Sequence, residues 1–212
     1  MYVIGAGGHG KGVAEIFQLR GLQVRLLESD PARIGARILD CIVASEPETL
    51  SALRGSVDFF VAIGDADVRR RVSETWQQRG HQPATAIHPT AVLSPHAQLE
   101  SGCCLMANAV VQVDCQIGPG TIINTGATVD HDCRLGEYVH IAPGAHLAGE
   151  VTVGEAGWIG IGSVVRERIR IGPSTLVGAG SVVTKDLPAD VLAYGNPCRV
   201  VRTRSLADPP SA

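Results

Sequence analysis

The sequence predicts an α/β domain at the N-terminus, followed by a parallel β-helix built from six-residue repeats. Three observations carry this prediction. A glycine-rich turn, GAGGHG, follows the first apolar run; strand-like and helix-like segments then alternate; and from Ile87 onward an aliphatic residue recurs at every sixth position. Alternating strands and helices are typical of a parallel sheet, whereas a fixed six-residue period is typical of a β-helix.

The first segment of the chain predicts the α/β domain. Residues 2–4 form an apolar strand, and apolar side chains at Val13, Ile16, Phe17 and Leu19 then recur at helical spacing. The segments VRLLESDP, EPETLSALRG, VDFFVAIGDADVRRRV and HQPATAI continue as strand, helix, strand with helix, and a last extended run. Right-handed crossovers place such strands side by side in a parallel sheet.

The glycine-rich turn has the spacing of a nucleotide-binding fingerprint. Gly5, Gly7 and Gly10 match G-x-G-x-x-G, and Glu28 closes the next strand, 18 residues after Gly10. Glycines at these places let the backbone approach a pyrophosphate at a helix N-terminus. The domain is about half the length of a dinucleotide fold, which favours one nucleotide-diphosphate group over NAD. A tight turn without a ligand is the structural alternative, although such a turn does not require His9.

The six-residue period covers residues 87 to 188 without an insertion. Every first position of its 17 hexads is Ile, Leu or Val, and the fifth position is mostly small. If both positions point inward and the chain turns by about 120° between them, it closes a triangular coil every 18 residues. Residues 18 apart then lie on top of each other, about 4.8 Å apart. Cys103, Cys115 and Cys133 occupy fifth positions, so they are predicted to fill the interior.

The same period gives His131 a special place. In the hexad VDHDCR, His131 takes the third position, a corner of the column, with Asp132 beside it. Gly149 follows 18 residues later and occupies the same corner one coil on. An outward imidazole with a bare backbone N–H one coil away fits acyl transfer, in which a base removes a proton and an amide stabilises the oxyanion.

Other histidines fall elsewhere on the column. His140 and Asn124 border a different face, across the column from the His131 corner, so a shared site requires a second chain. His146 flanks the strand leading to Gly149, where it either lines a ligand groove or is solvated. His81, His88 and His96 are interpreted as ordinary solvated histidines.

Composition narrows the classes of partner and compartment. The 212-residue chain has a formal net charge of -3 and a pI near 6.1, so no basic surplus attracts nucleic acid or anionic lipid. It lacks a signal-peptide pattern and any long apolar run, and its six cysteines include no CxxC pair. We therefore expect a cytoplasmic protein without disulfides, membrane insertion or a nucleic-acid partner.

The motifs GAGGHGK, AIGDADVRRRV, NTGATVDHDC and YGNPCRVVR span nearly the whole chain. They resemble the bacterial sugar acyltransferases that join a small Rossmann-like nucleotide-binding domain to a left-handed parallel β-helix of hexapeptide repeats. That family includes N-acetyltransferases acting on nucleotide-linked 4-aminosugars, as in bacillosamine synthesis, and sialic-acid O-acetyltransferases. The resemblance implies domains at 1–83 and 84–190, and a segment at 191–212 that combines CoA-proximal residues with a flexible tail.

The resemblance also implies residue roles. His131 would be the general base, Asp132 would tune it, and the Gly149 amide would polarise the thioester carbonyl of acetyl-CoA. The acceptor-binding positions would be Gly5, Gly7, Gly8, His9, Gly10, Glu28, Asp65, Arg69, Asn124 and His140. The CoA-binding positions would be His146, Ala148, Gly149, Gly160, Ile161, Gly178, Ala179 and Pro197. Members are typically trimeric, so a homotrimer with active sites between subunits is expected, and no metal.

The leading hypothesis is acetyl transfer from acetyl-CoA to the amino group of a nucleotide-linked 4-amino-dideoxysugar. Direct attack is expected, because no Ser or Cys at the corner offers a nucleophile for an acyl-enzyme. Glu28-Ser29-Asp30 stands where UDP-sugar members often have two consecutive aspartates, so the nucleotide base stays open.

Four alternatives remain. One is O-acetylation of sialic acid or another sugar. A metal lyase resembling γ-class carbonic anhydrases would use His131, His140 and His146, but the six-residue spacing of the last two turns them about 120° apart. A nicotinamide-dependent dehydrogenase is disfavoured by the domain size, and a non-catalytic sugar-nucleotide-binding scaffold would not require acetyl-CoA.

Overall fold

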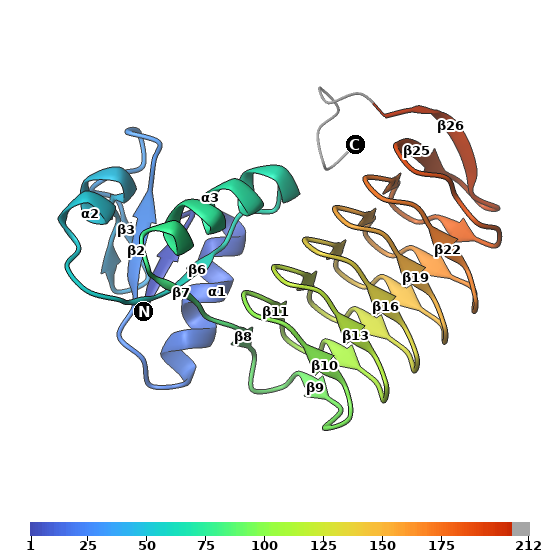
Figure 1. Ribbon diagram of the computed structural model, residues 1–212, viewed down its shortest axis with the longest axis horizontal. Coiled ribbons are helices and arrows are strands. Elements are labelled where there is room, and N and C mark those ends of the chain that lie inside the picture. Colours follow the sequence, from blue (N-terminus) through green and yellow to red (C-terminus); the bar gives the residue numbers. More distant parts are fainter. Residues whose placement is uncertain (205–212) are drawn as a thin grey trace. The chain divides into compact units, whose positions relative to one another are not determined.

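A computed structural model describes residues 1–204 of the chain. The chain divides into two compact units, Met1–Pro89 and the residues from Thr90 on (Figure 1). Most of the tail that is predicted to be flexible, residues 205–212, lies outside the described residues. Within residues 1–204, none of the helices combines the length and the apolar character that crossing a membrane requires.

The first unit is built on a five-stranded parallel sheet with the strand order β5-β2-β1-β6-β7, as predicted for the α/β domain. Its strands are β1 (Tyr2–Ile4), β2 (Arg25–Glu28), β5 (Ala44–Ser45), β6 (Asp58–Val61) and β7 (Gln82–Pro83). Its helices are α1 (Gly8–Leu19), α2 (Glu46–Ala52) and α3 (Ala66–Gln78), and β8 (Ala86–Ile87) closes the unit. The sequence pattern does not predict the antiparallel hairpin of β3 (Arg37–Ile38) and β4 (Cys41–Ile42), because two-residue strands are too short to show a period.

Two glycines of the first turn are explained by the packing of α1 on β1. Gly5 has a φ of +102°, and a Cβ there would lie 2.8 Å from the carbonyl oxygen of Ala62. A Cβ on Gly10 would collide with the carbonyl oxygen of Gly5. Only glycine allows this close approach, so the packing alone explains glycine at positions 5 and 10.

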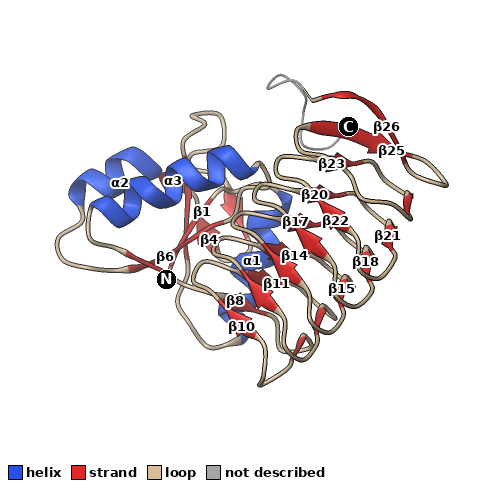
Figure 2. Cartoon of the chain, turned by 45° about the vertical axis from the view of Figure 1, so that its right-hand side comes forward, coloured by secondary structure: helices blue, strands red, loops and turns tan. Residues whose placement is uncertain are grey.

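The second unit is a three-sided column of short parallel strands that alternate with corner loops (Figure 2). The first face carries β9 (Val92–Leu93), β12 (Val110–Val111), β15 (Thr128–Val129), β18 (His146–Leu147), β21 (Val164–Val165) and β24 (Val182–Val183). The second face carries β10 (Gln98–Leu99), β13 (Gln116–Ile117), β16 (Arg134–Leu135), β19 (Thr152–Val153) and β22 (Arg170–Ile171). The third face carries β11 (Cys104–Leu105), β14 (Ile122–Ile123), β17 (His140–Ile141), β20 (Trp158–Ile159), β23 (Leu176–Val177), β25 (Val191–Tyr194) and the antiparallel β26 (Arg199–Thr203).

The stacking register confirms the period read from the sequence. Paired residues in adjacent coils are 18 apart from β9 to β24, as in Thr128 against His146 and Gln116 against Arg134, and the spacing shortens to 16 where Leu176 pairs with Leu192. First-position side chains fill the interior; Val129 and Ile141, for example, are fully buried. Burial of each such side chain contributes about 1.5–3 kcal/mol, which makes the column a stiff support for its corners.

The corners turn through residues in the left-handed backbone region. The fourth positions of the hexads from Gly102 to Gly180 all have a positive φ, between 53° and 72°. Glycine, Asn and Asp tolerate this region best, and other residues there cost about 1–2 kcal/mol each. Asp132 and Glu150 are two of these corner residues, so their place is fixed by the coil itself.

Small side chains at the fifth positions do more than fill the interior. Cys103, Cys115 and Cys133 are fully buried, and each Sγ lies 2.9 to 3.2 Å from the carbonyl oxygen of the residue 15 positions further along. Thr121 and Ser163 make the same bond at 3.0 Å. In each case the acceptor is the carbonyl oxygen of the second hexad position at a corner of the next coil. These donors therefore satisfy carbonyl groups that the strand ladder leaves unbonded. The inward orientation of the cysteines was predicted, whereas their role as donors was not; all six cysteines are free thiols.

Candidate active site

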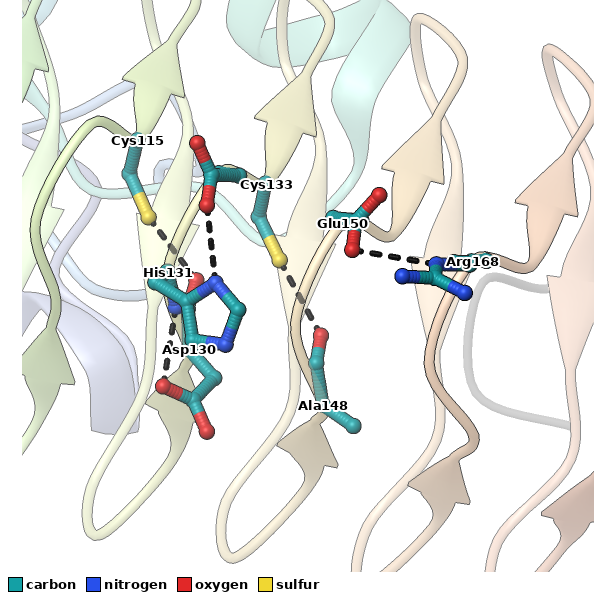
Figure 3. A network of polar contacts seen from close by, with 8 residues as sticks. Cys115, Asp130, His131, Cys133, Ala148, Glu150 and Arg168 are labelled. Atoms are coloured by element: carbon teal, nitrogen blue, oxygen red, sulfur yellow. Dashed lines mark hydrogen bonds and ion pairs between the residues drawn. The ribbon is translucent and has the colours of Figure 1, made fainter.

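The predicted catalytic residues lie at the corner between the first and second faces of the column. The turn Asp130–Asp132 joins β15 to β16, and the side chain of His131 points outward with half of its surface exposed. Its Nδ1 lies 2.8 Å from Oδ2 of Asp132, and its backbone N–H donates to Oδ1 of Asp130 at 2.8 Å (Figure 3). The outward orientation read from the six-residue period is therefore present.

The carboxylates around His131 prepare its ring to accept a proton. The hydrogen bond to Asp132 raises the pKa of His131, and the negative charges of Asp130 and Glu150 act in the same direction. When Nδ1–H is directed at Asp132, the neutral imidazole carries its lone pair on Nε2. This tautomer leaves Nε2 on the solvent side as a base.

Gly149 lies directly against the imidazole, one coil further along. A Cβ on Gly149 would lie 2.6 Å from Nε2 of His131 and 2.5 Å from Cε1, so any larger residue would displace the ring. The N–H of Glu150 donates to the carbonyl oxygen of His131 at 2.9 Å, which ties the two coils together here. The Gly149 N–H has no hydrogen-bond acceptor among residues 1–204, so it is available to a ligand.

A second group of polar residues lies on the third face. Nδ2 of Asn124 lies 3.1 Å from Nε2 of His140, and the imidazole packs against the indole of Trp158 with 4.0 Å between ring centroids. His140 is only 5% exposed. Trp158 was not identified from the sequence, although its position 18 residues after His140 is the signal that could have found it.

Most residues predicted to bind CoA lie at a different corner from His131. Gly160, Ile161, Gly178, Ala179 and Pro197 follow strands of the third face, and Ile161 is 60% exposed. Gly160 and Gly178 also have steric reasons to be glycine. A Cβ on Gly160 would lie 2.6 Å from the backbone N of Ala179, and one on Gly178 would lie 2.8 Å from Cβ of Tyr194.

Two predicted CoA-binding residues border the first face instead. His146 points outward from β18, and its Nδ1 lies 2.9 Å from Oγ1 of Thr128. Ala148 lies in the same corner as Gly149, and its carbonyl oxygen accepts the hydrogen bond of the Cys133 thiol at 3.2 Å. Both residues are therefore close in sequence and stacking order to the corner that carries His131.

The glycine-rich turn of the first unit is open at Gly8. The N-cap residue Gly7 precedes α1, and a Cβ on the exposed Gly8 would meet nothing within 4 Å. The chain itself therefore does not need glycine at position 8. Burial, together with the nearby positive charge of Arg69, lowers the pKa of His9 to about 4, so this imidazole is neutral at physiological pH.

His9 also leaves a buried nitrogen unsatisfied. Its Nε2 has no hydrogen-bond partner among the described residues. Buried polar groups are nearly always paired, so such an atom next to a glycine-rich turn is a group that a ligand can satisfy.

The other predicted acceptor-binding residues of this unit have partners within it. Glu28 accepts hydrogen bonds from the backbone N–H groups of Ala6 and Ser29, at 3.0 and 2.9 Å. Asp65 caps α3 by accepting from the N–H of Val68 at 2.8 Å. The fully buried Arg69 donates to the carbonyl oxygens of Ile63 and Gly64. Their contact with a ligand stays a prediction.

Arg33 is a residue near this turn that the sequence did not single out. Its guanidinium lies 4.0 Å from Glu28 and 3.8 Å from Asp30, and a Cβ on Gly7 would lie 3.4 Å from it. A cation beside a glycine-rich turn is suited to a phosphate group. No sequence motif marks it, because it lies in an irregular segment.

The histidines considered for a metal site do not come together in one chain. His131 lies at a corner, His140 on the third face and His146 on the first face. Among residues 1–204, no group of three His, Cys, Asp or Glu side chains is placed to hold a metal ion.

Two family models match the chain: the PglD N-terminal domain over residues 1–76, and the bacterial transferase hexapeptide (six repeats) over residues 114–149. One similar solved structure is perosamine N-acetyltransferase from Caulobacter crescentus, a histidine-to-asparagine variant in complex with CoA and GDP-perosamine. It is 41% identical in sequence to this chain, with a TM-score of 0.90, and the match covers 94% of this chain and 95% of that chain. The chain belongs to the hexapeptide-repeat sugar N-acetyltransferase family. Its column is accordingly a left-handed parallel β-helix.

Other members of the family are similar over the same length. The acetyltransferase domain of PglB from Neisseria gonorrhoeae FA1090 is 38% identical with a TM-score of 0.89, covering 94% of this chain and 98% of that chain. WeeI from Acinetobacter baumannii AYE is 28% identical with a TM-score of 0.88, at the same coverage of 94% and 98%. No protein with a curated function matches the chain significantly.

Proposed function

We propose that this protein transfers the acetyl group of acetyl-CoA to the amino group of a nucleotide-linked 4-amino-dideoxysugar. One observation carries the proposal: the imidazole of His131, held by Asp132 at 2.8 Å, lies against Gly149, whose N–H has no acceptor among residues 1–204. A base next to an unbonded amide donor is the pair of groups that acyl transfer to an amine needs.

The two groups act on opposite ends of the reacting centre. Nε2 of His131 accepts the proton of the amine as its nitrogen forms a bond to the thioester carbonyl carbon. The N–H of Gly149 donates to the carbonyl oxygen as negative charge develops there. When the carbon–sulfur bond breaks, His131 returns its proton to the leaving sulfur, so the products are an amide and the CoA thiol. A positioned base contributes about 10²- to 10⁴-fold and one oxyanion donor about 10²- to 10³-fold in rate.

The first unit supplies the binding site for the nucleotide. The open position at Gly8, the unsatisfied Nε2 of His9 and the nearby guanidinium of Arg33 support a diphosphate bound at the start of α1. GDP-linked aminosugars are the first acceptors to test, because relatives 41% and 42% identical were solved with GDP-perosamine.

Residues for the two substrates divide between two corners, which supports a homotrimer. His131 and Gly149 border the first face on one side, whereas Asn124 and Ile161 border it on the other. The strands between them present exposed apolar side chains, such as Val92 (58%) and Val164 (40%). If neighbouring columns cover this face, the corner of one chain meets the opposite corner of the next.

Acetyl-CoA would then lie between neighbouring columns. The residues proposed to hold it are His146, Ala148, Gly149, Gly160, Ile161, Gly178, Ala179 and Pro197. We place the enzyme in the cytoplasm, where both acetyl-CoA and nucleotide sugars are available.

The decisive experiment follows thiol release from acetyl-CoA with purified protein and a panel of acceptors: UDP-, GDP- and dTDP-linked 4-aminosugars and free sialic acid. We expect turnover with a nucleotide-linked aminosugar, and a loss of about 10²- to 10⁴-fold in His131→Ala. His96→Ala, at an exposed corner of an earlier coil, is the matched control and should keep wild-type activity. Turnover with sialic acid alone would replace this proposal by O-acetylation, and a fully active, folded His131→Ala would remove the base.

A further inference from the structure

Two thiols lie among the fifth-position residues of the corner that carries His131. Down this corner the fifth positions are Ala97, Cys115, Cys133, Val151, Ile169 and Leu187. Only the two cysteines have a hydrogen-bond donor. Their acceptors are the carbonyl oxygens of Asp130 and Ala148, at 2.9 and 3.2 Å (Figure 3). These are the residues immediately before His131 and Gly149, so the thiols occur at the coils that support the two reacting groups.

The bond from Cys133 acts on the peptide group that carries the oxyanion donor. The carbonyl of Ala148 and the N–H of Gly149 belong to one planar peptide unit, in which the two groups point in opposite directions. The carbonyl end accepts from Sγ of Cys133 in the fully buried interior. The Gly149 end of this peptide faces His131: a Cβ on Gly149 would lie 2.6 Å from Nε2 of the imidazole, and the Gly149 N–H has no acceptor among residues 1–204. A hydrogen bond at the inner end therefore fixes the rotation of the outer end.

We propose that Cys133 is a positioning residue for the oxyanion donor: its thiol holds and polarises the Ala148–Gly149 peptide so that the Gly149 N–H is aimed beside Nε2 of His131. The inference rests on the proposed function, in which this N–H stabilises the oxyanion. Hydrogen bonds in a chain strengthen one another by about 10–30% per bond, so the inner bond also makes the outer N–H a better donor.

The environment of Cys133 keeps its thiol in the form that donates. The neighbouring Cys115 thiol and burial raise the pKa of Cys133 well above its usual range. A raised pKa favours the protonated thiol, which is the form that donates a hydrogen bond. The position also excludes a role as an exposed nucleophile, because Cys133 has no accessible surface.

The chain itself shows which substitutions this position tolerates. Cys133→Ser keeps a donor, and Ser163 makes the same bond at 3.0 Å in another coil. Cys133→Val removes the donor but fills the space, as Val151 does at the equivalent place in the next coil of this corner. Cys133→Ala removes the donor and leaves a small side chain, as at Ala97.

Cys103→Ala is a matched control for the loss of a buried thiol bond. Sγ of Cys103 donates to the carbonyl oxygen of Gly118 at 3.2 Å, the same distance as the bond of Cys133. The peptide that it supports continues into Pro119, which has no N–H, and lies at another corner. Cys103→Ala therefore loses a similar structural contact without touching the catalytic peptide.

The test is steady-state kinetics of the five proteins with acetyl-CoA and the acceptor found above, together with their thermal unfolding. We expect kcat to fall about three- to tenfold in Cys133→Ala and Cys133→Val, with the KM for acetyl-CoA unchanged within about twofold. Cys133→Ser should restore at least about half of the wild-type kcat. Cys103→Ala should keep the full wild-type kcat, and its melting temperature should be close to that of Cys133→Ala.

Three results would overturn the inference. The first is a wild-type kcat in both Cys133→Ala and Cys133→Val, and the second is a Cys133→Ser variant as slow as these two. The third is a Cys103→Ala variant that is equally slow. Failure of the proposed function is distinguishable, because it appears as a wild-type rate in His131→Ala whatever the Cys133 variants do.

Discussion

Replacing Gly149 by Ala tests the juxtaposition of the amide and the imidazole. The substitution keeps the backbone N–H but places a methyl group 2.5 Å from Cε1 and 2.6 Å from Nε2 of His131. Because nonbonded carbon atoms settle at about 3.5 Å, the ring has to move by about 1 Å. A displacement of about 1 Å at a reacting group costs about 10²-fold in rate. We therefore expect kcat/KM to fall about 10²-fold in Gly149→Ala.

The folded state should barely change, because the colliding atoms belong to a half-exposed side chain and not to the backbone. Thiol release measures the loss, and thermal unfolding checks the fold. The double variant His131→Ala/Gly149→Ala isolates the cause: without the imidazole there is no collision, so Gly149→Ala should add no further loss. The reasoning is refuted if Gly149→Ala alone keeps more than about a third of the wild-type kcat/KM.

Three further outcomes follow from the structure. Asp132→Asn removes the carboxylate that raises the pKa of His131. Since only the neutral ring accepts a proton, the acid limb of the pH profile of kcat/KM should move to lower pH. The plateau of kcat/KM should fall about tenfold, because the tautomer of His131 is less firmly fixed. An unchanged acid limb would contradict this. Ile141→Ala empties a fully buried position and should lower the free energy of unfolding by about 2–5 kcal/mol in urea denaturation; a loss below about 1 kcal/mol would exclude tight packing there. Val164→Lys places a charge on the exposed face between the two corners and should abolish the proposed trimer in sedimentation without changing circular dichroism; a trimer that persists in this variant would place the interface elsewhere.

The fold was predictable because its signal is repeated many times. An aliphatic residue at each first position sets the strand, the corner and the 18-residue stacking together, and Val129 and Ile141 are buried as that rule requires. The hairpin of β3 and β4 was not predictable, because strands of two residues that occur once leave no period.

The candidate site was predictable only where the backbone repeat alone places it. The stacking of Gly149 over His131 follows from counting 18 residues. Contacts that depend on side-chain conformation did not follow. The 18-residue spacing places Trp158 beside His140 in the stack, but the sequence does not show how the two rings pack. Nor does it show that Glu28 bonds to the glycine-rich turn, because rotamers are chosen by the packed environment.

The donor role of Cys133 illustrates the same limit. Its inward position follows from the period, and its size is explained by the narrow interior. Its hydrogen bond to Ala148 depends on the thiol direction within the coil, which only the structure gives.

The central claim concerns where the reactants lie at the His131 corner, and a crystal structure with the acceptor sugar nucleotide and a non-reactive acetyl-CoA analogue tests it most directly. We predict that the acceptor nitrogen lies about 2.7–3.2 Å from Nε2 of His131, and the thioester oxygen within the same range of the Gly149 nitrogen. An acceptor nitrogen held by another base, or a thioester oxygen turned away from Gly149, would contradict the account.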